Sequence, residues 1–390
     1  MLVRMGLLPR RISSELSARL KSPETAAAVA GLENKLTRRR REQKISSGAF
    51  RGMQVVVYRG YVADGDVARV RVRVVEVPEL PGDSRIPYWE VAQANVRRHA
   101  ALAIVGVEVT LTIGRHSATA VTDGHGFASF SLPVPGLRAG WHTARAETTP
   151  IEGGEFASGT GQVVKPPRRA PFLVISDIDD TILLTGLTEG VAMVARTVLR
   201  EAEERRAIPG MAALYAGLRR GVTTRSGNRR PAPEFFYVST GSWSFYPLLE
   251  QFIELRGFPR GPMFLTDWGP TERYLRRSGA EHKRTAIRRL LESYPGLPFV
   301  LIGDSGQRDP ATYAEMAREF DGRVALILIR QVGGDDEDRN AEVRQRASEL
   351  RAEGIPLHLV RDAAAAAELA QAAGLCDEQT LAEVAAELDA

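Results

Sequence analysis

Two aspartates separated by one residue follow an apolar run near the middle of the chain. The run Phe-Leu-Val-Ile leads into Ser-Asp-Ile-Asp-Asp-Thr, which places Asp177 and Asp179 directly after it. Because alternate residues of an extended segment point to the same side, both carboxylates are expected to face one site. Neighbouring carboxylates repel, unless a divalent cation neutralises one while the other holds or shares a proton. The pair predicts metal-assisted acid–base chemistry, or the DxD metal site of a glycosyltransferase.

A second polar group follows the apolar run Phe-Phe-Tyr-Val. It consists of Ser239, Thr240 and Gly241, and we expect the strand to end at Ser239. A hydroxyl and free backbone N–H groups at a helix start are able to hold phosphate oxygens. The structural alternative is that Ser239 serves only as a helix N-cap.

Two more candidate groups lie further along the chain. Asp304 ends the run Phe-Val-Leu-Ile-Gly, and Asp309 follows five residues later, so together they offer one direct carboxylate for Mg²⁺ and a second to orient it. Asp309 precedes Pro310, which also suits N-cap and N1 positions of a helix. Lys283 is one of only five lysines in a chain that otherwise uses arginine, and a compact ammonium binds differently from a guanidinium fork.

Apolar runs alternating with helical segments predict the element that positions these groups. Runs near residues 172, 235, 299, 324 and 356 are rich in apolar residues and predict strands. The first, Phe-Leu-Val-Ile, is wholly apolar, as expected of a strand buried on both faces. Helical patterns lie around 191–205, 245–256, 281–293, 310–319, 338–352 and 362–374. We therefore predict an α/β domain, a Rossmann-like parallel sheet with helices on both faces, whose strand ends carry the reactive groups.

The segment before this domain has period-two patterning and predicts an antiparallel β-sandwich. Val-Arg-Val-Arg-Val-Val alternates as a half-buried strand should, and residues 122–126 read as the turn of a hairpin. That hairpin resembles those of immunoglobulin-like and transthyretin-like modules. The expected organisation is a basic helical segment at 1–50, the β-sandwich at 51–165, the α/β domain at 170–376 and a C-terminal helix at 377–390.

Composition and charge narrow the function classes. Hydrophobic residues at 44% and charged residues at 26% are typical of a globular protein, and the single cysteine, Cys376, excludes an internal disulfide framework. Residues 1–50 hold eleven basic and four acidic side chains, which is typical either of a segment that contacts an anionic surface or of a solvated basic tail. The basic run lacks interleaved aromatics, so no nucleic-acid partner is expected. We expect a cytoplasmic protein, and the basic segment leaves open whether it also makes peripheral contact with anionic membranes.

The order of the four candidate groups resembles the haloacid dehalogenase superfamily: DxDxT, a strand-end Ser or Thr, Lys, then GDxxxxD. This resemblance implies that Asp177 is the nucleophile that forms an aspartyl-phosphate and that Asp179 is the acid and base. It further implies that Thr181 braces the loop and that Ser239 and Lys283 bind phosphoryl oxygens. Thr240 and Gly241 are expected beside Ser239 in the substrate site.

The same resemblance implies a Mg²⁺ cofactor. Its ligands would be Asp177, the backbone carbonyl of Asp179 and Asp304, with Asp309 in support.

Longer segments narrow the resemblance to one family. SDIDDTI, IPGMAALYAGL, FFYVSTGSWSFYPLLEQF and LIGDSGQRDPATY are similar to the magnesium-dependent phosphatidate phosphatases of the actin-patch-protein type, over roughly residues 171–375. The resemblance implies that phosphatidate is hydrolysed to diacylglycerol. A phosphatase of a soluble phosphomonoester is the alternative, and a module that binds an anionic surface or partner with little catalysis is the second. Oligomeric state is not predicted.

Overall fold

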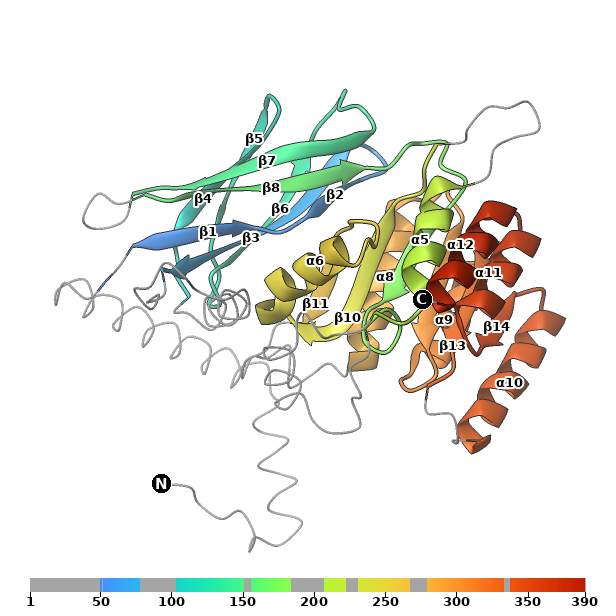
Figure 1. Ribbon diagram of the computed structural model, residues 1–390. Helices are drawn as coiled ribbons and strands as arrows, with labels where there is room; N and C mark the ends of the chain where they lie inside the picture. Colours follow the sequence, from blue (N-terminus) through green and yellow to red (C-terminus); the bar gives the residue numbers. More distant parts are fainter. Residues whose placement is uncertain are drawn as a thin grey trace, which may run out of the picture.

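The computed structural model describes residues 50, 52–77, 103–150, 156–183, 207–221, 231–266, 279–332 and 337–389. Two sheets organise this part of the chain (Figure 1). The basic segment predicted at 1–50 lies outside it, except for Phe50, as does the helix predicted at 191–205. Among the described residues, none of the helices combines the length and the apolar character needed to cross a membrane.

The first sheet has eight strands that enclose their own apolar core. They are β1 (Met53–Val57), β2 (Gly60–Ala63), β3 (Val67–Glu76), β4 (Glu108–Ile113), β5 (His116–Val121), β6 (Phe127–Pro133), β7 (Gly140–Thr148) and β8 (Ser158–Lys165). The order is β1-β3-β2-β8-β7-β4-β5, with β6 on the other edge of β3. Strands from both ends of this order share one core, which includes Val57, Val72, Leu111, Phe130 and Ala144.

Two details of the predicted sandwich are wrong. The sheet is not purely antiparallel, because β2 pairs with β8 in parallel. The predicted hairpin around residues 122–126 is also wrong, since β5 pairs with β4 and β6 pairs with β3. The turn instead joins the two ends of one continuous sheet, where β5 and β6 lie next to each other.

The second sheet has six parallel strands in the order β11-β10-β9-β12-β13-β14. These are β9 (Leu173–Asp177), β10 (Phe235–Ser242), β11 (Met263–Thr266), β12 (Phe299–Asp304), β13 (Val324–Arg330) and β14 (Leu357–Val360). The runs predicted as strands near residues 172, 235, 299, 324 and 356 are therefore strands of this sheet, and β9 and β12 are buried along their whole length. The sequence reading missed β11, whose four residues Met-Phe-Leu-Thr are too short to stand out.

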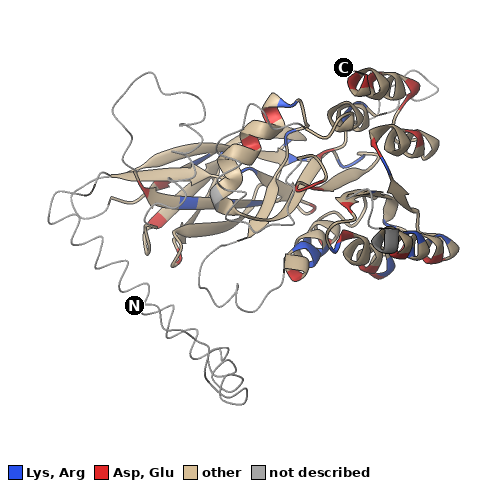
Figure 2. Cartoon of the chain, turned by 60° about the horizontal axis from the view of Figure 1, so that its bottom comes forward, with Lys and Arg blue, Asp and Glu red and all other residues tan. Residues whose placement is uncertain are grey.

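Helices cover both faces of the parallel sheet, which confirms the predicted α/β arrangement. One face packs against α5 (Met211–Arg220), α6 (Tyr246–Leu255), α11 (Ala363–Ala372) and α12 (Glu378–Leu388). The opposite face packs against α8 (Gly279–Ser293), α9 (Asp309–Glu319) and α10 (Glu337–Ala352). Helix α5 was not predicted as a separate element, whereas α12 lies within the helix predicted at 377–390. Helices α8, α9 and α10 carry both acidic and basic residues (Figure 2).

The two sheets are joined by specific contacts. The Tyr58 ring lies 4.5 Å from the Trp243 ring and 4.8 Å from the Tyr246 ring, measured between centroids. The Arg59 guanidinium pairs with Glu250 at 3.2 Å and also contacts Glu254. These contacts place the β1–β2 connection directly against α6.

Candidate active site

The candidate site lies at the point in the parallel sheet where the strand order reverses, so that the connections from neighbouring strands run to opposite sides of the sheet. Strand β9 pairs with both β10 and β12, and successive strands are added outward from this centre on either side. In open parallel sheets this reversal point leaves a crevice at the carboxyl ends of the strands. Asp177 ends β9 and Asp304 ends β12, so both carboxylates lie at the crevice.

Three buried carboxylates meet at this point. Asp177, Asp304 and Asp309 are all 0% exposed, and one oxygen from each lies within 4.8 Å of the others. Lys283 on α8 lies between two of them: its Nζ is 2.8 Å from Asp177 Oδ1 and 2.7 Å from Asp309 Oδ1. The structure therefore brings together four of the predicted residues from four different elements.

Burial and the neighbouring charges shift the pKa values of Asp177 and Lys283. Burial raises the pKa of Asp177 well above its ordinary value; Lys283 opposes this shift, and the neighbouring carboxylates add to it. Burial alone would lower the pKa of Lys283, but Asp177 and Asp309 outweigh it and raise this pKa. Lys283 is therefore held as a cation, and it favours the ionised form of Asp177.

Asp304 has an oxygen that fits a cation ligand. Its Oδ1 accepts from the backbone N–H groups of Gly306 at 2.6 Å and Gln307 at 3.0 Å. Its Oδ2 is buried and has no hydrogen-bond partner among the described residues. Burial, followed by the charge of Asp309, raises the pKa of Asp304 to about 6. A cluster of buried carboxylates with an unsatisfied oxygen suits a hard divalent cation.

Asp179 lies in the turn after β9 and has a different partner. Its Oδ2 accepts a hydrogen bond from Ser239 Oγ at 2.7 Å, and the Gly241 N–H donates to the same hydroxyl at 2.9 Å. The Asp179 carboxylate is outside the three-carboxylate cluster. It is nevertheless close enough that its charge contributes to the raised pKa of Asp177. The two aspartates thus occupy adjoining parts of one site.

The strand carrying Ser239 continues further than predicted. Strand β10 runs to Ser242, and the hydroxyl of Thr266 on β11 donates to the Thr240 carbonyl at 2.8 Å. Ser239 is therefore not at a helix start, and it is not an N-cap, because the N-cap of α6 is Phe245. Phosphate binding by a helix N-terminus at Ser239 is accordingly wrong, and any contact with phosphate must come from its hydroxyl or from strand backbone.

The N-cap alternative for Asp309 is also wrong. The N-cap of α9 is Arg308, so Asp309 is the first helical residue, and its carboxylate turns to Lys283. Local sequence alone could not show this, because the partner lies on another helix.

The loop after β9 is braced by two side chains. Thr181 is fully buried, and its Oγ1 donates to Asp177 Oδ2 over a long 3.4 Å. Arg330, the last residue of β13, donates from Nε to the Asp180 carbonyl at 2.7 Å. Asp180 itself has a φ of 52°, in the left-handed region. Sequence reasoning missed Arg330, although its place at a strand's carboxyl end was the available signal.

Gly303 allows the closest packing in the cluster. A Cβ at this position would lie 2.5 Å from Asp309 Oδ2 and 2.9 Å from Asp309 Cβ. We expect Gly303→Ala to displace Asp309 and to lower the free energy of unfolding by about 1–3 kcal/mol, the usual cost of overpacking. Urea unfolding measures this change. Gly296→Ala is the control, since nothing lies within 4 Å of a Cβ there, and equal losses in the two variants would contradict the expectation.

The part of the chain that carries this cluster is similar to a known protein family. Residues 172–331 match the family model described as phosphatidate phosphatase APP1, catalytic domain. The predicted resemblance is confirmed over this segment. We refer to residues 172–331 as the APP1-type segment; it contains Asp177, Asp179, Ser239, Lys283 and Asp304.

Two curated proteins are similar to this chain. The phosphatidate phosphatase APP1 of Saccharomyces cerevisiae is 32% identical over 185 residues, which are 47% of this chain and 30% of that protein. An uncharacterized protein of Schizosaccharomyces pombe is 29% identical over 163 residues, which are 42% of this chain and 25% of that protein. The chain thus spans less than a third of the length of either relative.

Solved structures overlap only weakly with this chain. A carbohydrate acetylesterase from Xanthomonas citri covers 84% of this chain and 71% of its own, at 10% identity and a TM-score of 0.29. A β-glucuronidase from Parabacteroides merdae covers 72% of this chain and 34% of its own, at 11% identity and a TM-score of 0.23. Overlaps this low say nothing about the function of this chain.

Proposed function

We propose that this protein is a Mg²⁺-dependent phosphatase that hydrolyses phosphatidate to diacylglycerol and phosphate, on a haloacid dehalogenase-like domain. The observation that supports this most is the buried cluster of Asp177, Lys283, Asp304 and Asp309, at the sheet's reversal point, within the APP1-type segment. The name of the yeast relative supports phosphatidate as substrate. The proposal keeps the predicted domain organisation, with a basic segment at 1–50, a β-sandwich at 51–165, the phosphatase domain at 170–376 and a C-terminal helix at 377–390.

Asp177 is the proposed nucleophile. One of its carboxylate oxygens attacks phosphorus, a P–O bond forms to Asp177, and the bond from phosphorus to the lipid alkoxide breaks. Lys283 supports this step because it stabilises the ionised carboxylate at 2.8 Å. In the second step water attacks the same phosphorus, phosphate leaves, and the Asp177 carboxylate is restored.

Asp179 is the proposed acid and base. In its protonated form it gives its proton to the departing alkoxide, and as carboxylate it then takes a proton from the attacking water. Ser239 supports this role because its hydroxyl donates to Asp179 Oδ2 at 2.7 Å and so fixes the orientation of the carboxylate. Thr240 and Gly241 continue the strand beside it, where their polar groups are proposed to contact the substrate.

The chain's residues fit a magnesium ion. Asp177 and Asp304 would hold it, with the Asp179 carbonyl as a further ligand and Asp309 orienting the set through Lys283 and the Asp304 N–H. When bound, Mg²⁺ supplies positive charge that offsets the carboxylates and the phosphoryl oxygens.

Location and further partners also belong to this proposal. We propose that the protein works in the cytoplasm and that the basic residues of segment 1–50 contact anionic membranes, where the lipid substrate resides. A side-by-side measurement of liposome binding with and without residues 1–45 tests that contact.

Phosphate release from two substrates tests the proposed activity. The substrates are phosphatidate in mixed micelles and a soluble phosphomonoester, each assayed with Mg²⁺ and with EDTA. We expect release from the lipid in Mg²⁺ and a loss of at least about 100-fold in EDTA, because the metal's charge stabilisation is worth several kcal/mol. Release from the soluble ester alone would keep the chemistry and overturn the lipid substrate. No release from either would favour a binding module.

A further inference from the structure

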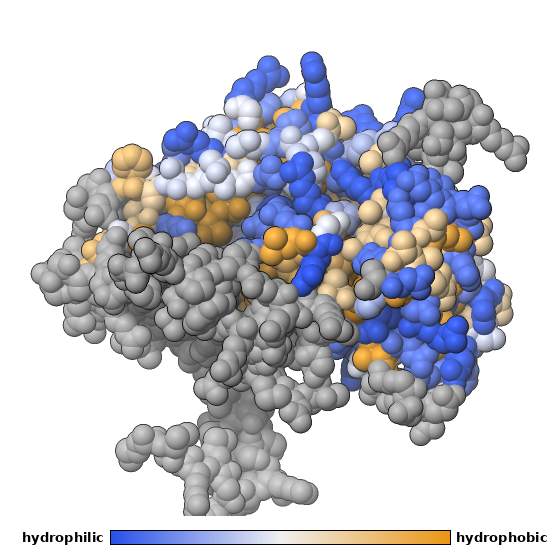
Figure 3. Space-filling view, viewed as in Figure 1, coloured by the Kyte–Doolittle hydropathy of each residue, from blue (hydrophilic) through white to orange (hydrophobic). Residues whose placement is uncertain are grey.

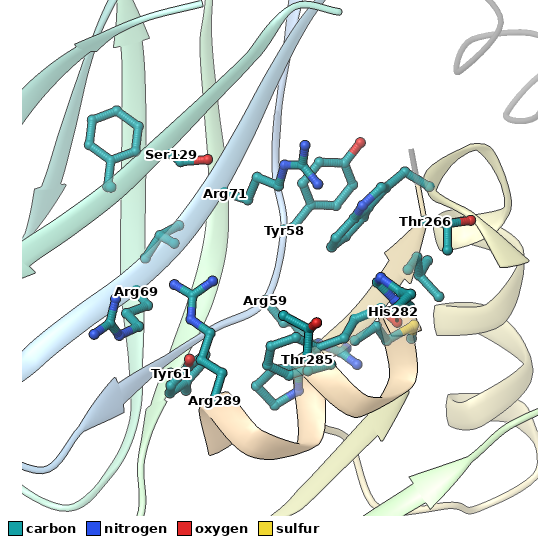
Figure 4. Close-up of a pocket in the computed structure, with 18 of the residues that line it drawn as sticks. Tyr58, Arg59, Tyr61, Arg69, Arg71, Ser129, Thr266, His282, Thr285 and Arg289 are labelled. Carbon is teal, nitrogen blue, oxygen red and sulfur yellow. Dashed lines mark hydrogen bonds between the residues drawn. The ribbon is translucent and has the colours of Figure 1, made fainter. Parts of the chain in front are cut away.

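A cavity of about 540 Å³ lies between the eight-stranded sheet and the parallel-sheet domain (Figure 4). Its walls come from β2, β3 and β6 on one side and from β11 and α8 on the other. This volume is in the range that accommodates a small organic ligand. In the space-filling view, hydrophobic and hydrophilic residues border each other where the two domains meet (Figure 3).

The arginines of the alternating strand β3 face this cavity. Ala68, Val70 and Val72 point into the core of the eight-stranded sheet, so Arg69 and Arg71 point to the opposite side. The register places Arg69 opposite Ser131 and Arg71 opposite Ser129 on β6. Directly opposed residues share a face, and the short serine side chains leave room beside the guanidinium groups.

Helix α8 supplies the facing wall. His282, Ala286 and Arg289 line the cavity at spacings of four and three residues, which places them on one stripe of the helix. Figure 4 shows Arg289 extending from this helix toward the side on which Arg69 and Arg71 lie. Among the described residues, neither Arg69 nor Arg289 forms an ion pair.

Several buried hydrogen-bond donors around the cavity have no acceptor among the described residues. They are the Tyr61 hydroxyl, the Trp243 Nε1–H and the Arg69 Nε–H. Tyr61 is 4% exposed and Trp243 is 7% exposed, so water reaches them poorly. Unsatisfied buried donors are costly, and a set of donors with cations is complementary to an anion's oxygens.

The acidic and apolar residues of the wall define the ligand further. Asp123 is the carboxylate in the wall, and its Oδ1 already accepts from the backbone of His125 and Phe127. Met263, Phe264 and Leu265 add apolar surface from β11. The cavity therefore combines a cationic side with an apolar side.

We propose that this cavity binds an amphiphilic organic phosphate. The phosphate group of this ligand lies among Arg69, Arg71 and Arg289, and the apolar part of the ligand lies against β11 and Trp243. The site is separate from the carboxylate cluster, and it does not depend on catalysis. Its wall includes Thr240 and His282, the direct neighbours of Ser239 and Lys283. A ligand there would touch the two elements that carry these candidate catalytic residues.

Calorimetric titration of the full chain in EDTA tests the proposal, with dihexanoyl phosphatidate and inorganic phosphate as separate probes. We expect the lipid phosphate to bind, and Arg69→Gln and Arg289→Gln each to weaken its affinity about tenfold or more, since each removes hydrogen bonds to a charged group. Arg115→Gln, on an exposed turn of the same sheet, is the matched control and should not change the affinity.

The outcomes separate the possibilities. Equal affinity in wild type and both cavity variants would overturn the site, and so would the absence of binding. Equal binding of inorganic phosphate would overturn the amphiphilic part of the proposal. Thermal unfolding without ligand adds an independent readout: because Arg69 has no ion-pair partner among the described residues, we expect its neutralisation to leave the unfolding temperature unchanged or higher. A clear loss of stability would instead assign the arginines a structural role.

Discussion

Replacing Asp177 with asparagine is expected to lower phosphate release by roughly 10⁴-fold or more, the scale of effect seen when a catalytic nucleophile is removed. Asparagine keeps the shape of the side chain but removes the attacking carboxylate. The fold should persist, because burial already disfavours the charge at this position and Lys283 retains Asp309 as its partner. The measurement is phosphate release in Mg²⁺, alongside thermal unfolding of the same preparation.

Asp362→Asn is the matched control for this substitution. Asp362 caps α11 by accepting from the Ala365 N–H at 2.9 Å, and asparagine caps helices about as well as aspartate. Its activity should equal that of wild type. Retention of activity in Asp177→Asn to within tenfold of wild type would rule out Asp177 as the nucleophile.

The covalent step has a readout of its own. With a leaving group that needs no protonation, such as a nitrophenolate, Asp179→Asn should still allow attack by Asp177 but should slow the attack of water. The phosphorylated protein then accumulates and is visible by intact mass after acid quenching. No such species should form in the Asp177→Asn/Asp179→Asn double variant, and its absence in Asp179→Asn would count against the aspartyl-phosphate.

The core of the candidate site could be predicted from sequence because its signals are long and physically strong. Apolar runs lead into Asp177 at the end of β9 and into Asp304 at the end of β12, so the sequence identifies both carboxyl ends. The carboxyl ends of parallel strands meet at one edge of the sheet. This logic placed Asp177 and Asp304 together. Lys283 joined them only through its unusual residue type, since no local pattern shows that a helix will aim one side chain at a sheet edge.

The remaining features of the cavity and of the candidate site could not be predicted, because they depend on contacts between segments that are distant in the sequence. Alternation in β3 shows that its two faces differ, but it does not show what covers the polar face. The sequence therefore predicts only a half-buried strand here, whereas Arg69 and Arg71 lie against the second domain. Asp309 read equally well as an N-cap, because Lys283 is 26 residues away in sequence. Arg330 was missed for the same reason: its partner, the Asp180 carbonyl, is 150 residues away.

Replacing Lys283 with methionine is expected to lower the free energy of unfolding by about 3–5 kcal/mol in EDTA, the usual cost of leaving buried charges without their partner. Lys283 is 3% exposed and is the cation between Asp177 and Asp309. Methionine fills similar volume, so the loss reports the charge and not a cavity. Urea unfolding in EDTA measures it.

Two further results are expected if the loss of stability in Lys283→Met comes from the carboxylate cluster. Mg²⁺ should recover part of the loss, since a divalent cation held by Asp177 and Asp304 replaces some of the missing positive charge. Adding Asp309→Asn to Lys283→Met should also recover part of the lost stability, because it removes one of the three mutually repelling carboxylates.

The control is Lys165→Met. Lys165 is the other lysine among the described residues, and it pairs with the more exposed Asp66. Its loss should be about 1 kcal/mol and insensitive to Mg²⁺. If both lysine variants lose the same stability, and Mg²⁺ restores neither, the cluster is not the charge-balanced metal site that the proposed chemistry requires.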